Sequence, residues 1–147
     1  MMDLIASLTE LKSKIVLSSK TGGGSGSILK MEIEMNCYLF IYCVWRIEHN
    51  NIVLATSDDD SQAQIGRMAK SAKLLENKKV TSLSLSDQYD LTICFDDNYC
   101  FRAFCNISYS QTENGGTYDT NWELCLPSEN IVFKINNHFK EEMEAYY

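Results

Sequence analysis

Two stretches with the same order of hydrophobic and polar positions stand far apart in this chain. Each contains a tryptophan, Trp45 or Trp122, within an apolar run that leads into a polar turn holding asparagine. A short β-branched run follows each turn, at residues 52–54 and 131–133. An apolar run, a polar turn and a second apolar run predict a β-hairpin. We therefore expect two similar hairpins, one in each half of the chain.

The remaining hydrophobic positions alternate between helical and strand spacing. Apolar side chains recur at helical spacing over residues 2–12 and again over residues 61–75, where three aspartates precede the stretch and are expected to cap it. Apolar and polar residues alternate over residues 28–34 and 91–95, which predicts half-buried strands. The other expected elements are strands at residues 15–17, 37–48, 80–85 and 99–107 and a short C-terminal helix at residues 136–146.

The match between the halves extends beyond the tryptophan hairpins. Leu29, Met31 and Ile33 align with a similar alternating run at residues 91–95. We predict a single domain over residues 1–147 with two pseudo-repeated halves, approximately residues 2–57 and 60–135, although chance similarity is the alternative because aliphatic matches are common. Neither half could bury its sheet face alone, so the two are expected to pack about a pseudo-twofold axis.

These elements predict an α+β fold. We expect one strongly curved, mostly antiparallel sheet or barrel of about eight or nine strands, flanked by about two or three helices. Hydrophobic residues make up 45% of the chain and charged residues 22%, which is typical of a globular domain and not of a disordered one.

Charge and hydrophobicity narrow the classes of partner. The formal net charge of −7 repels phosphate backbones and favours basic partners, so nucleic acid is not expected to bind. The longest apolar run, residues 37–45, is well short of the roughly 20 residues that span a bilayer. The start of the chain also lacks a signal-peptide pattern. We therefore expect a soluble, cytoplasmic protein that does not bind membranes.

Residues that could carry chemistry are few. Six cysteines include no Cys-x-x-Cys pair, and only His49 and His138 could assist a metal or a triad. The glycine-rich residues 21–27 could cradle a phosphate, but they lack the Gly-Lys-Ser/Thr ending and lead into a strand pattern. We expect a loop joining two strands there, and we predict no catalytic residues, no metal site and no cofactor.

Three segments carry a family resemblance. They are Gly26-Ser27-Ile28-Leu29, Tyr42-Cys43-Val44-Trp45-Arg46 and the later Asn121-Trp122-Glu123-Leu124-Cys125-Leu126-Pro127. Their order resembles that in small bacterial proteins, mostly uncharacterised, some of which are immunity proteins of polymorphic or contact-dependent toxin systems. The resemblance implies a non-enzymatic cytoplasmic protein that neutralises a cognate toxin by direct binding. It carries no functional residue across.

Candidate partner-binding residues follow from this hypothesis and from the charge. An acidic inhibitor is expected to cover a basic toxin through exposed acids beside loops. The candidates are Asp58, Asp59, Asp60, Asp96, Asp97, Glu113 and Asp119.

Other functions are open at this point. One alternative is a small-molecule-binding barrel. Its cavity would be lined by Tyr38, Tyr42, Trp45, Phe101 and Trp122. An uncharacterised structural or interaction protein, or an enzyme of unrecognised type, is also possible; an enzyme would need a cleft in which histidines or carboxylates converge.

Overall fold

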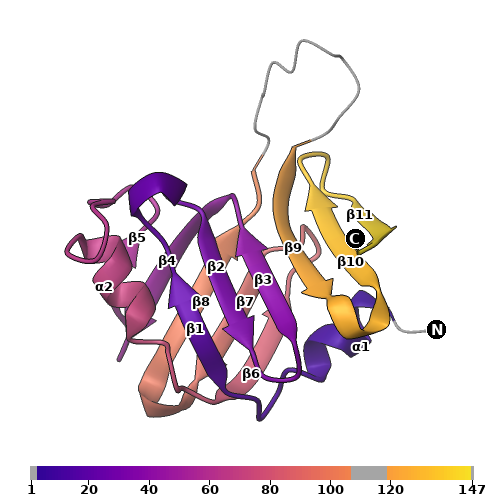
Figure 1. The fold of residues 1–147 in the computed structure, drawn as a ribbon, viewed down its shortest axis with the longest axis horizontal. Helices are drawn as coiled ribbons and strands as arrows, with labels where there is room; N and C mark the ends of the chain where they lie inside the picture. Colours follow the sequence, from indigo (N-terminus) through magenta and orange to yellow (C-terminus); the bar gives the residue numbers. More distant parts are fainter. Residues whose placement is uncertain (1–2, 107–118, 147) are drawn as a thin grey trace.

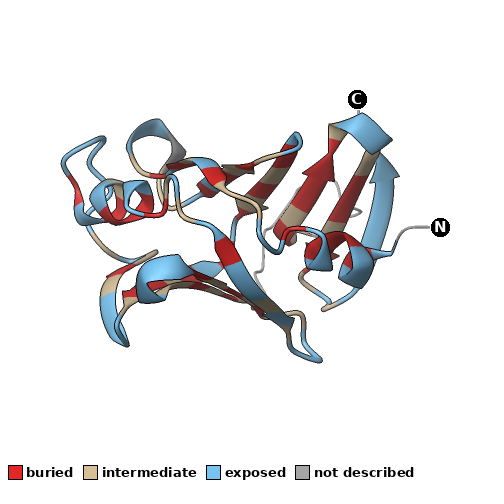
Figure 2. Cartoon of the chain, turned by 90° about the horizontal axis from the view of Figure 1, so that it is seen from below, coloured by how far each residue is buried: buried red, intermediate tan, exposed pale blue. Residues whose placement is uncertain are grey.

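The protein is built from two antiparallel sheets that lie in separate layers. A computed structural model describes residues 3–106 and 119–146. Within them, one sheet has the strand order β1-β2-β3-β9-β10-β11 and the other the order β5-β4-β8-β7-β6. Figure 1 shows the strands β1, β2 and β3 of the first sheet in front of the second sheet, and Figure 2 shows buried residues in both layers.

The element bounds are as follows. The six-stranded sheet comprises β1 (Val16–Lys20), β2 (Leu29–Ile33), β3 (Cys37–Ile41), β9 (Thr120–Leu126), β10 (Ile131–Asn136) and β11 (Glu141–Ala145). The five-stranded sheet comprises β4 (Val44–His49), β5 (Ile52–Thr56), β6 (Val80–Leu85), β7 (Leu91–Phe95) and β8 (Tyr99–Phe104). The helices of the described residues are α1 (Leu4–Thr9) and α2 (Arg67–Lys73), with short 3-10 turns η1 (Gly23–Ser25), η2 (Asp96–Asn98) and η3 (Pro127–Glu129).

The two α-helices begin in different ways. Asp3 caps α1, because its Oδ1 accepts a hydrogen bond from the Ala6 backbone N–H at 2.7 Å. α2 follows Gly66 without a side-chain cap, so the aspartates expected to cap it do not. Gly66 is required by space, since a Cβ there would lie 2.6 Å from the Asp60 carbonyl oxygen. α2 packs against β1 and β5, each of which is an edge strand of its sheet.

The strand orders of the two sheets correspond. Let each of the strands β1 to β5 be exchanged with the strand five places later, so that β1 exchanges with β6 and β5 with β10. The order β1-β2-β3-β9-β10 then becomes β6-β7-β8-β4-β5, which is the five-stranded sheet read from its other edge. The segments that enter β1 and β6 also bond reciprocally: the Val16 N–H donates to the Lys78 carbonyl at 2.9 Å, and the Val80 N–H donates to the Lys14 carbonyl at 2.8 Å. These relations are what a pseudo-twofold arrangement of the halves would produce; an internal repeat in the sequence stays a prediction.

The two tryptophans lie at corresponding positions of this arrangement. Trp45 on β4 and Trp122 on β9 are both fully buried. The indole N–H of Trp45 donates to the Ser27 carbonyl at 2.7 Å, and that of Trp122 donates to the Tyr89 carbonyl at 2.9 Å. Each acceptor stands two residues before a strand, β2 or β7. Each indole therefore ties its hairpin to the start of a strand in the opposite sheet.

The predicted α+β fold with one curved sheet or barrel is wrong, because the described residues form a mostly β structure of two antiparallel sheets. The residues expected to form one long strand, 37–48, divide into β3 and β4, which belong to different sheets. The chain changes layer at Tyr42 and Cys43, whose backbone N–H groups both donate to the Asn121 carbonyl, at 2.8 and 3.0 Å. A continuous apolar run does not reveal such a corner, because residues on both sides of it face the same core. The described residues form eleven strands and two α-helices, where about eight or nine strands and two or three flanking helices were expected.

The predicted C-terminal helix is also wrong. Residues 141–145 form β11, which pairs antiparallel with β10. A turn precedes it, in which the Asn136 side-chain oxygen accepts hydrogen bonds from the backbone N–H groups of His138, at 2.9 Å, and Lys140, at 3.2 Å. Asparagine favours such turns over helix entry when a partner strand is available.

In the described part of the chain, no helix is long and apolar enough to cross a membrane.

Candidate functional site

The acids predicted to contact a partner lie in separate loops. Asp58, Asp59 and Asp60 lie between β5 and α2, Asp96 and Asp97 lie in η2, and Asp119 immediately precedes β9. Glu113 lies outside the described residues. The described acids therefore come from three separate segments of the chain.

Several of these acids already have structural roles. Asp59 and Asp60 accept backbone hydrogen bonds, at 2.6 Å from Thr56 and 3.0 Å from Gln62. Asp97 pairs with Lys78 at 2.7 Å, and this hydrogen-bonded ammonium lowers the pKa of the Asp97 carboxyl. These contacts stabilise the turns, and a role of the acids in partner binding stays a prediction.

The residues proposed to line an internal cavity do not surround a common space. Trp45, Phe101 and Trp122 are fully buried side chains of the packed interior, with the Trp45 and Phe101 ring centroids 6.3 Å apart. Tyr38 and Tyr42 lie on the other face of their sheet, where Tyr42 is 40% exposed. The small-molecule barrel is therefore contradicted both by the open sheets and by the position of its proposed lining.

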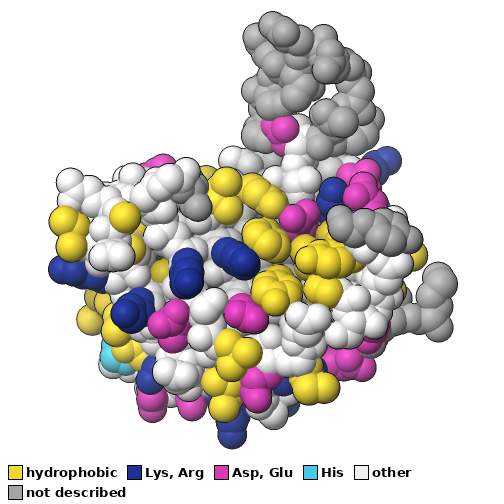
Figure 3. All heavy atoms as spheres, viewed as in Figure 1, with side chains coloured by type: hydrophobic (Ala, Val, Ile, Leu, Met, Phe, Trp, Pro, Cys, Tyr) yellow, Lys and Arg dark blue, Asp and Glu magenta, His cyan; other side chains and the backbone are white. Residues whose placement is uncertain are grey.

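The outer face of the six-stranded sheet is the candidate site. β3 turns Cys37, Leu39 and Ile41 into the core, so the intervening side chains Tyr38 and Phe40 face outward. We use the name aromatic face for the outward residues of β3 and their neighbours, namely Tyr38, Phe40, Tyr42, Lys30, Glu32 and Glu123. Neither helix crosses this part of the sheet in Figure 1, and Figure 3 shows hydrophobic side chains gathered there with charged ones around them.

Polar contacts hold the aromatic rings in place. The Tyr42 hydroxyl donates to Glu123 at 2.8 Å, and the Tyr38 hydroxyl donates to Glu32 at 3.3 Å. Burial and the carboxylate of Glu123 together raise the pKa of Tyr42. These tyrosines therefore act as neutral donors with their rings positioned in advance. Preorganised aromatic side chains are typical anchors of protein interfaces.

A charged side chain borders each side of the rings. The Lys30 ammonium lies 5.4 Å from the Tyr38 ring centroid and 5.6 Å from that of Phe40, within the range of cation–π attraction. On the β11 side, Lys134 pairs with Glu144 at 2.9 Å. An apolar centre with a charged rim matches the composition of binding surfaces.

The apolar centre continues across the sheet. Cys125 and Val132 lie beside Tyr38 in register, on β9 and β10, and both are buried. Burial raises the pKa of the Cys125 thiol to about 11, with Glu123 adding to the shift. Cys125 is therefore a neutral, unreactive thiol at neutral pH, and contributes packing area to the face.

The corresponding face of the five-stranded sheet has a different chemistry. In register, Arg102 replaces Phe40 and Glu48 replaces Cys125. Glu48 is 8% exposed and accepts hydrogen bonds from Arg46 at 2.5 Å and Arg102 at 2.9 Å. Burial works to raise the pKa of Glu48, but the two arginine hydrogen bonds outweigh it and the pKa is lowered. This face is closed by its own ion pairs, whereas the aromatic face is not.

Neither face shows a catalytic arrangement. His49 stacks on Tyr99 with ring centroids 4.1 Å apart, and His138 is exposed in the turn before β11. Among the described residues, no group of three or more histidine, cysteine, aspartate or glutamate side chains could hold a metal ion. What the aromatic face can supply is noncovalent binding.

Most residues of the aromatic face were not predicted from the sequence. Phe40, Glu32 and Glu123 were not among the candidates, and Tyr38 and Tyr42 were assigned to a cavity. The available signal was the alternation of residues 37–41, Cys-Tyr-Leu-Phe-Ile, in which the aromatics occupy one parity. It was obscured because both parities are hydrophobic, which is usual for a strand buried on both faces.

Comparisons with known proteins do not add to this description. The chain matches no protein-family model, and neither the curated proteins nor the solved structures include a significant match to it.

Proposed function

We propose that this chain is a non-enzymatic binding protein that engages a protein partner through its aromatic face. The observation that carries the proposal is the outward row of Tyr38, Phe40 and Tyr42 on a sheet face that neither helix of the described residues crosses. Aromatic side chains on a rigid strand supply large contact area at a low cost in conformational entropy.

The proposed partner is a basic protein. The chain carries a net charge of −7, and the acids Glu123, Glu142 and Glu144 face outward beside the aromatic centre. A basic partner would be attracted before contact and oriented by this rim. The resemblance noted in the sequence makes a bacterial toxin the specific partner we propose, with this chain as its cognate immunity protein.

The partner to test is set by the same resemblance. Immunity genes sit beside those of their toxins, so the test uses the product of the gene immediately upstream. Binding is measured by titration calorimetry for the wild-type chain and for Tyr38→Ala and Phe40→Ala. Truncating a central interface anchor costs about 2 kcal/mol or more, so each variant should bind at least about tenfold more weakly.

A matched control comes from the other sheet. Phe104, near the edge of the corresponding face, is partly buried like Phe40 and lies 5.1 Å from the Arg46 guanidinium. Phe104→Ala should leave the affinity unchanged. Equal losses for Phe40→Ala and Phe104→Ala would remove the aromatic face as the contact surface. Absence of binding by the wild-type chain would remove the proposed partner.

A further inference from the structure

A large surface hollow lies at the edge of the six-stranded sheet, beside the aromatic face. It has a volume of about 920 Å³ and lies between β1, α2 and the glycine-rich connection from β1 to β2. We call it the lysine hollow. Its lining includes Ser19, Lys20, Lys30, Phe40, Lys73 and Glu76. The size falls in the range of about 300–1,000 Å³ that is usual for small-molecule sites.

Three lysines but only one carboxylate, that of Glu76, line the hollow. The ion pairs found among the described residues involve Arg46, Arg102, Lys78 and Lys134, and therefore none of the lysines of the hollow. The carboxylate of Glu76 accepts a hydrogen bond from the Ser19 backbone N–H at 3.1 Å. In a chain of net charge −7, a local group of lysines without carboxylate partners marks a place suited to an anion.

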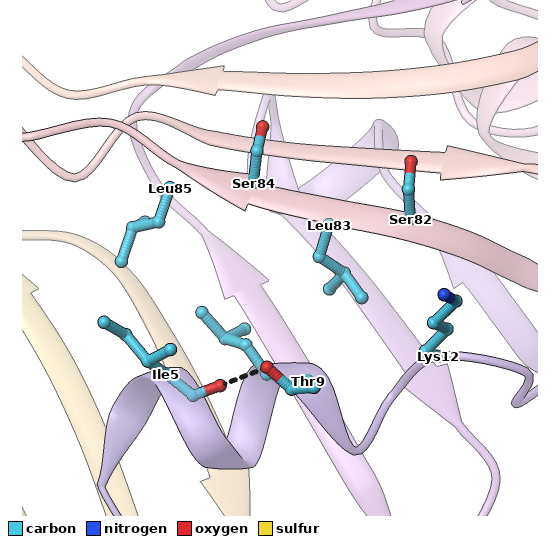
Figure 4. Close-up of a pocket in the computed structure, with 8 residues that line it drawn as sticks. Ile5, Thr9, Lys12, Ser82, Leu83, Ser84 and Leu85 are labelled. Carbon is cyan, nitrogen blue, oxygen red and sulfur yellow. Dashed lines mark hydrogen bonds between the residues drawn. The ribbon is translucent and has the colours of Figure 1, made fainter.

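The corresponding groove in the other half provides an internal comparison. It lies between α1 and β6, has a volume of about 280 Å³, and is lined by Ile5, Leu83 and Leu85 among others. Figure 4 shows Leu83 and Leu85 pointing toward α1, while Ser82 and Ser84 point away from it. Leucine side chains therefore occupy part of the space between helix and strand in this half.

Side chains of different size and charge occupy the same positions in the lysine hollow. By strand register, Ser19 takes the place of Leu83, since these residues pair with Met31 and Ile93. By the same register Lys20 replaces Ser84. The helices correspond in the same way: Ala69 and Lys73 of α2 occupy the positions of Ile5 and Thr9 in α1. The groove of the other half is smaller and has one lysine, Lys12, in its lining, so packing does not require three lysines or a hollow of this size.

A buried polar group in the hollow also lacks a partner. Ser19 is 2% exposed, and its hydroxyl forms no hydrogen bond with the described part of the protein. Most buried hydroxyls are hydrogen-bonded, and an unpaired one destabilises the folded protein. A hydroxyl retained where the other half has leucine, in the lining of a hollow, is consistent with a group kept for a ligand.

We propose that the lysine hollow binds a small molecule carrying a phosphate or pyrophosphate group. Lys20, Lys30 and Lys73 would hold the phosphate, because ammonium groups form charge-assisted hydrogen bonds with phosphate oxygens. Phe40 and the neighbouring Ile28 supply an apolar wall for the remainder of the ligand. The glycine-rich loop forms part of the boundary and does not cradle the phosphate: Gly23 instead packs close to residues 61–63, donating to the Ser61 carbonyl at 2.6 Å.

The test uses pyrophosphate and ADP as probes, and adenosine as a control ligand that lacks phosphate. Titration calorimetry on the wild-type chain should show binding of both phosphate probes, weakened by added salt, and none of adenosine. Lys20→Ser and Lys73→Thr copy the residues of the other half, and each should weaken ADP binding about tenfold or more. Lys12→Ala is the control, because Lys12 is exposed and lines the α1–β6 groove.

A further variant tests whether binding requires the open volume of the hollow, without a change of charge. Ala69→Ile copies Ile5 and should abolish ADP binding, while a thermal melt reports whether the variant remains folded. Should Ala69→Ile not fold, Lys73→Thr decides alone. The proposal is overturned by an absence of binding of both phosphate probes, by equal losses for Lys12→Ala and Lys73→Thr, or by adenosine binding as tightly as ADP. A short single-stranded DNA that binds more tightly than ADP would also overturn it, by assigning the surface to nucleic acid.

Discussion

At the scale of single residues, the two tryptophans are the anchors of the interior. Each is fully buried, and its indole N–H donates a hydrogen bond to a backbone carbonyl just before a strand. Trp45 donates to the Ser27 carbonyl and Trp122 to the Tyr89 carbonyl. Phenylalanine in place of either tryptophan would leave this carbonyl without its hydrogen-bond donor, and its smaller ring would leave a void in the core. The indoles therefore fix hairpin position as well as filling the core.

Trp45→Phe and Trp122→Phe should therefore destabilise the protein by similar amounts, about 1–3 kcal/mol each. Urea denaturation monitored by circular dichroism measures the change. Tyr42→Phe, which also removes one hydrogen-bond donor but at a side chain 40% exposed, is the control and should change stability by less than about 0.5 kcal/mol. A loss confined to one of the two tryptophans would show that the two sites are not equivalent.

Glu48 makes the stability depend on pH. Its pKa is lowered in the folded protein by hydrogen bonds from Arg46 and Arg102, which outweigh the opposing effect of burial. A group with a lowered folded-state pKa stabilises the protein above its unfolded pKa, about 4.3 for glutamate, and loses this contribution as the pH falls through the folded value. The stabilisation is therefore complete at neutral pH.

Glu48→Gln should be less stable than the wild type at pH 7, by about 1–3 kcal/mol for the lost charge-assisted hydrogen bonds. The difference should shrink as the pH is lowered below about 4. Urea midpoints across that range measure it, with Glu141→Gln on the exposed strand β11 as the control for loss of one negative charge. A difference that stays constant down to acid pH would contradict the role of the arginine pair.

At the scale of elements, the connection from each helix to its strand repeats an unusual backbone conformation. Ser13 precedes β1 with φ of 74°, and Asn77 precedes β6 with φ of 68°. The N–H groups of both residues bond across to the other half, Ser13 to Val80 and Asn77 to Val16, each at 2.8 Å. Asparagine tolerates the left-handed region better than serine does.

Ser13→Gly should therefore stabilise the protein, by about 0.5–1 kcal/mol, because glycine adopts positive φ without steric cost. Asn77→Gly serves as the matched comparison and should give a smaller gain. Thermal melts of the two variants measure both. A loss of stability in Ser13→Gly would show that the serine side chain contributes more than its backbone strain costs.

Elements that depend on local pattern could be predicted from the sequence. The hairpin turns at Asn50-Asn51 and Asp96–Asn98 form where polar turn residues interrupt alternating strands, and asparagines in both adopt positive φ. The layer change at Tyr42 and Cys43 could not be predicted, because a distant carbonyl of Asn121 holds it. The aromatic face and the lysine hollow were missed for the same reason: their residues come from segments that only the folded sheet brings together.

At the scale of the whole molecule, one framework of strands and helix is present in two versions with different surfaces. The corresponding outer faces carry Phe40 in one sheet and Arg102 in the other, and the corresponding grooves carry Ser19 in one half and Leu83 in the other. Features common to both halves, such as the buried tryptophans, serve stability. We assign function to the positions where the halves differ, because packing alone does not explain those differences.

The most direct test of this assignment is hydroxyl-radical footprinting of the chain alone and in complex with the product of the gene immediately upstream. Side chains in a contact surface lose solvent access and are oxidised more slowly. We predict slower oxidation of Tyr38, Phe40 and Tyr42 in the complex and unchanged oxidation of Phe104. Protection of Phe104 on the opposite sheet, with Tyr38, Phe40 and Tyr42 oxidised as fast as in the free chain, would contradict it.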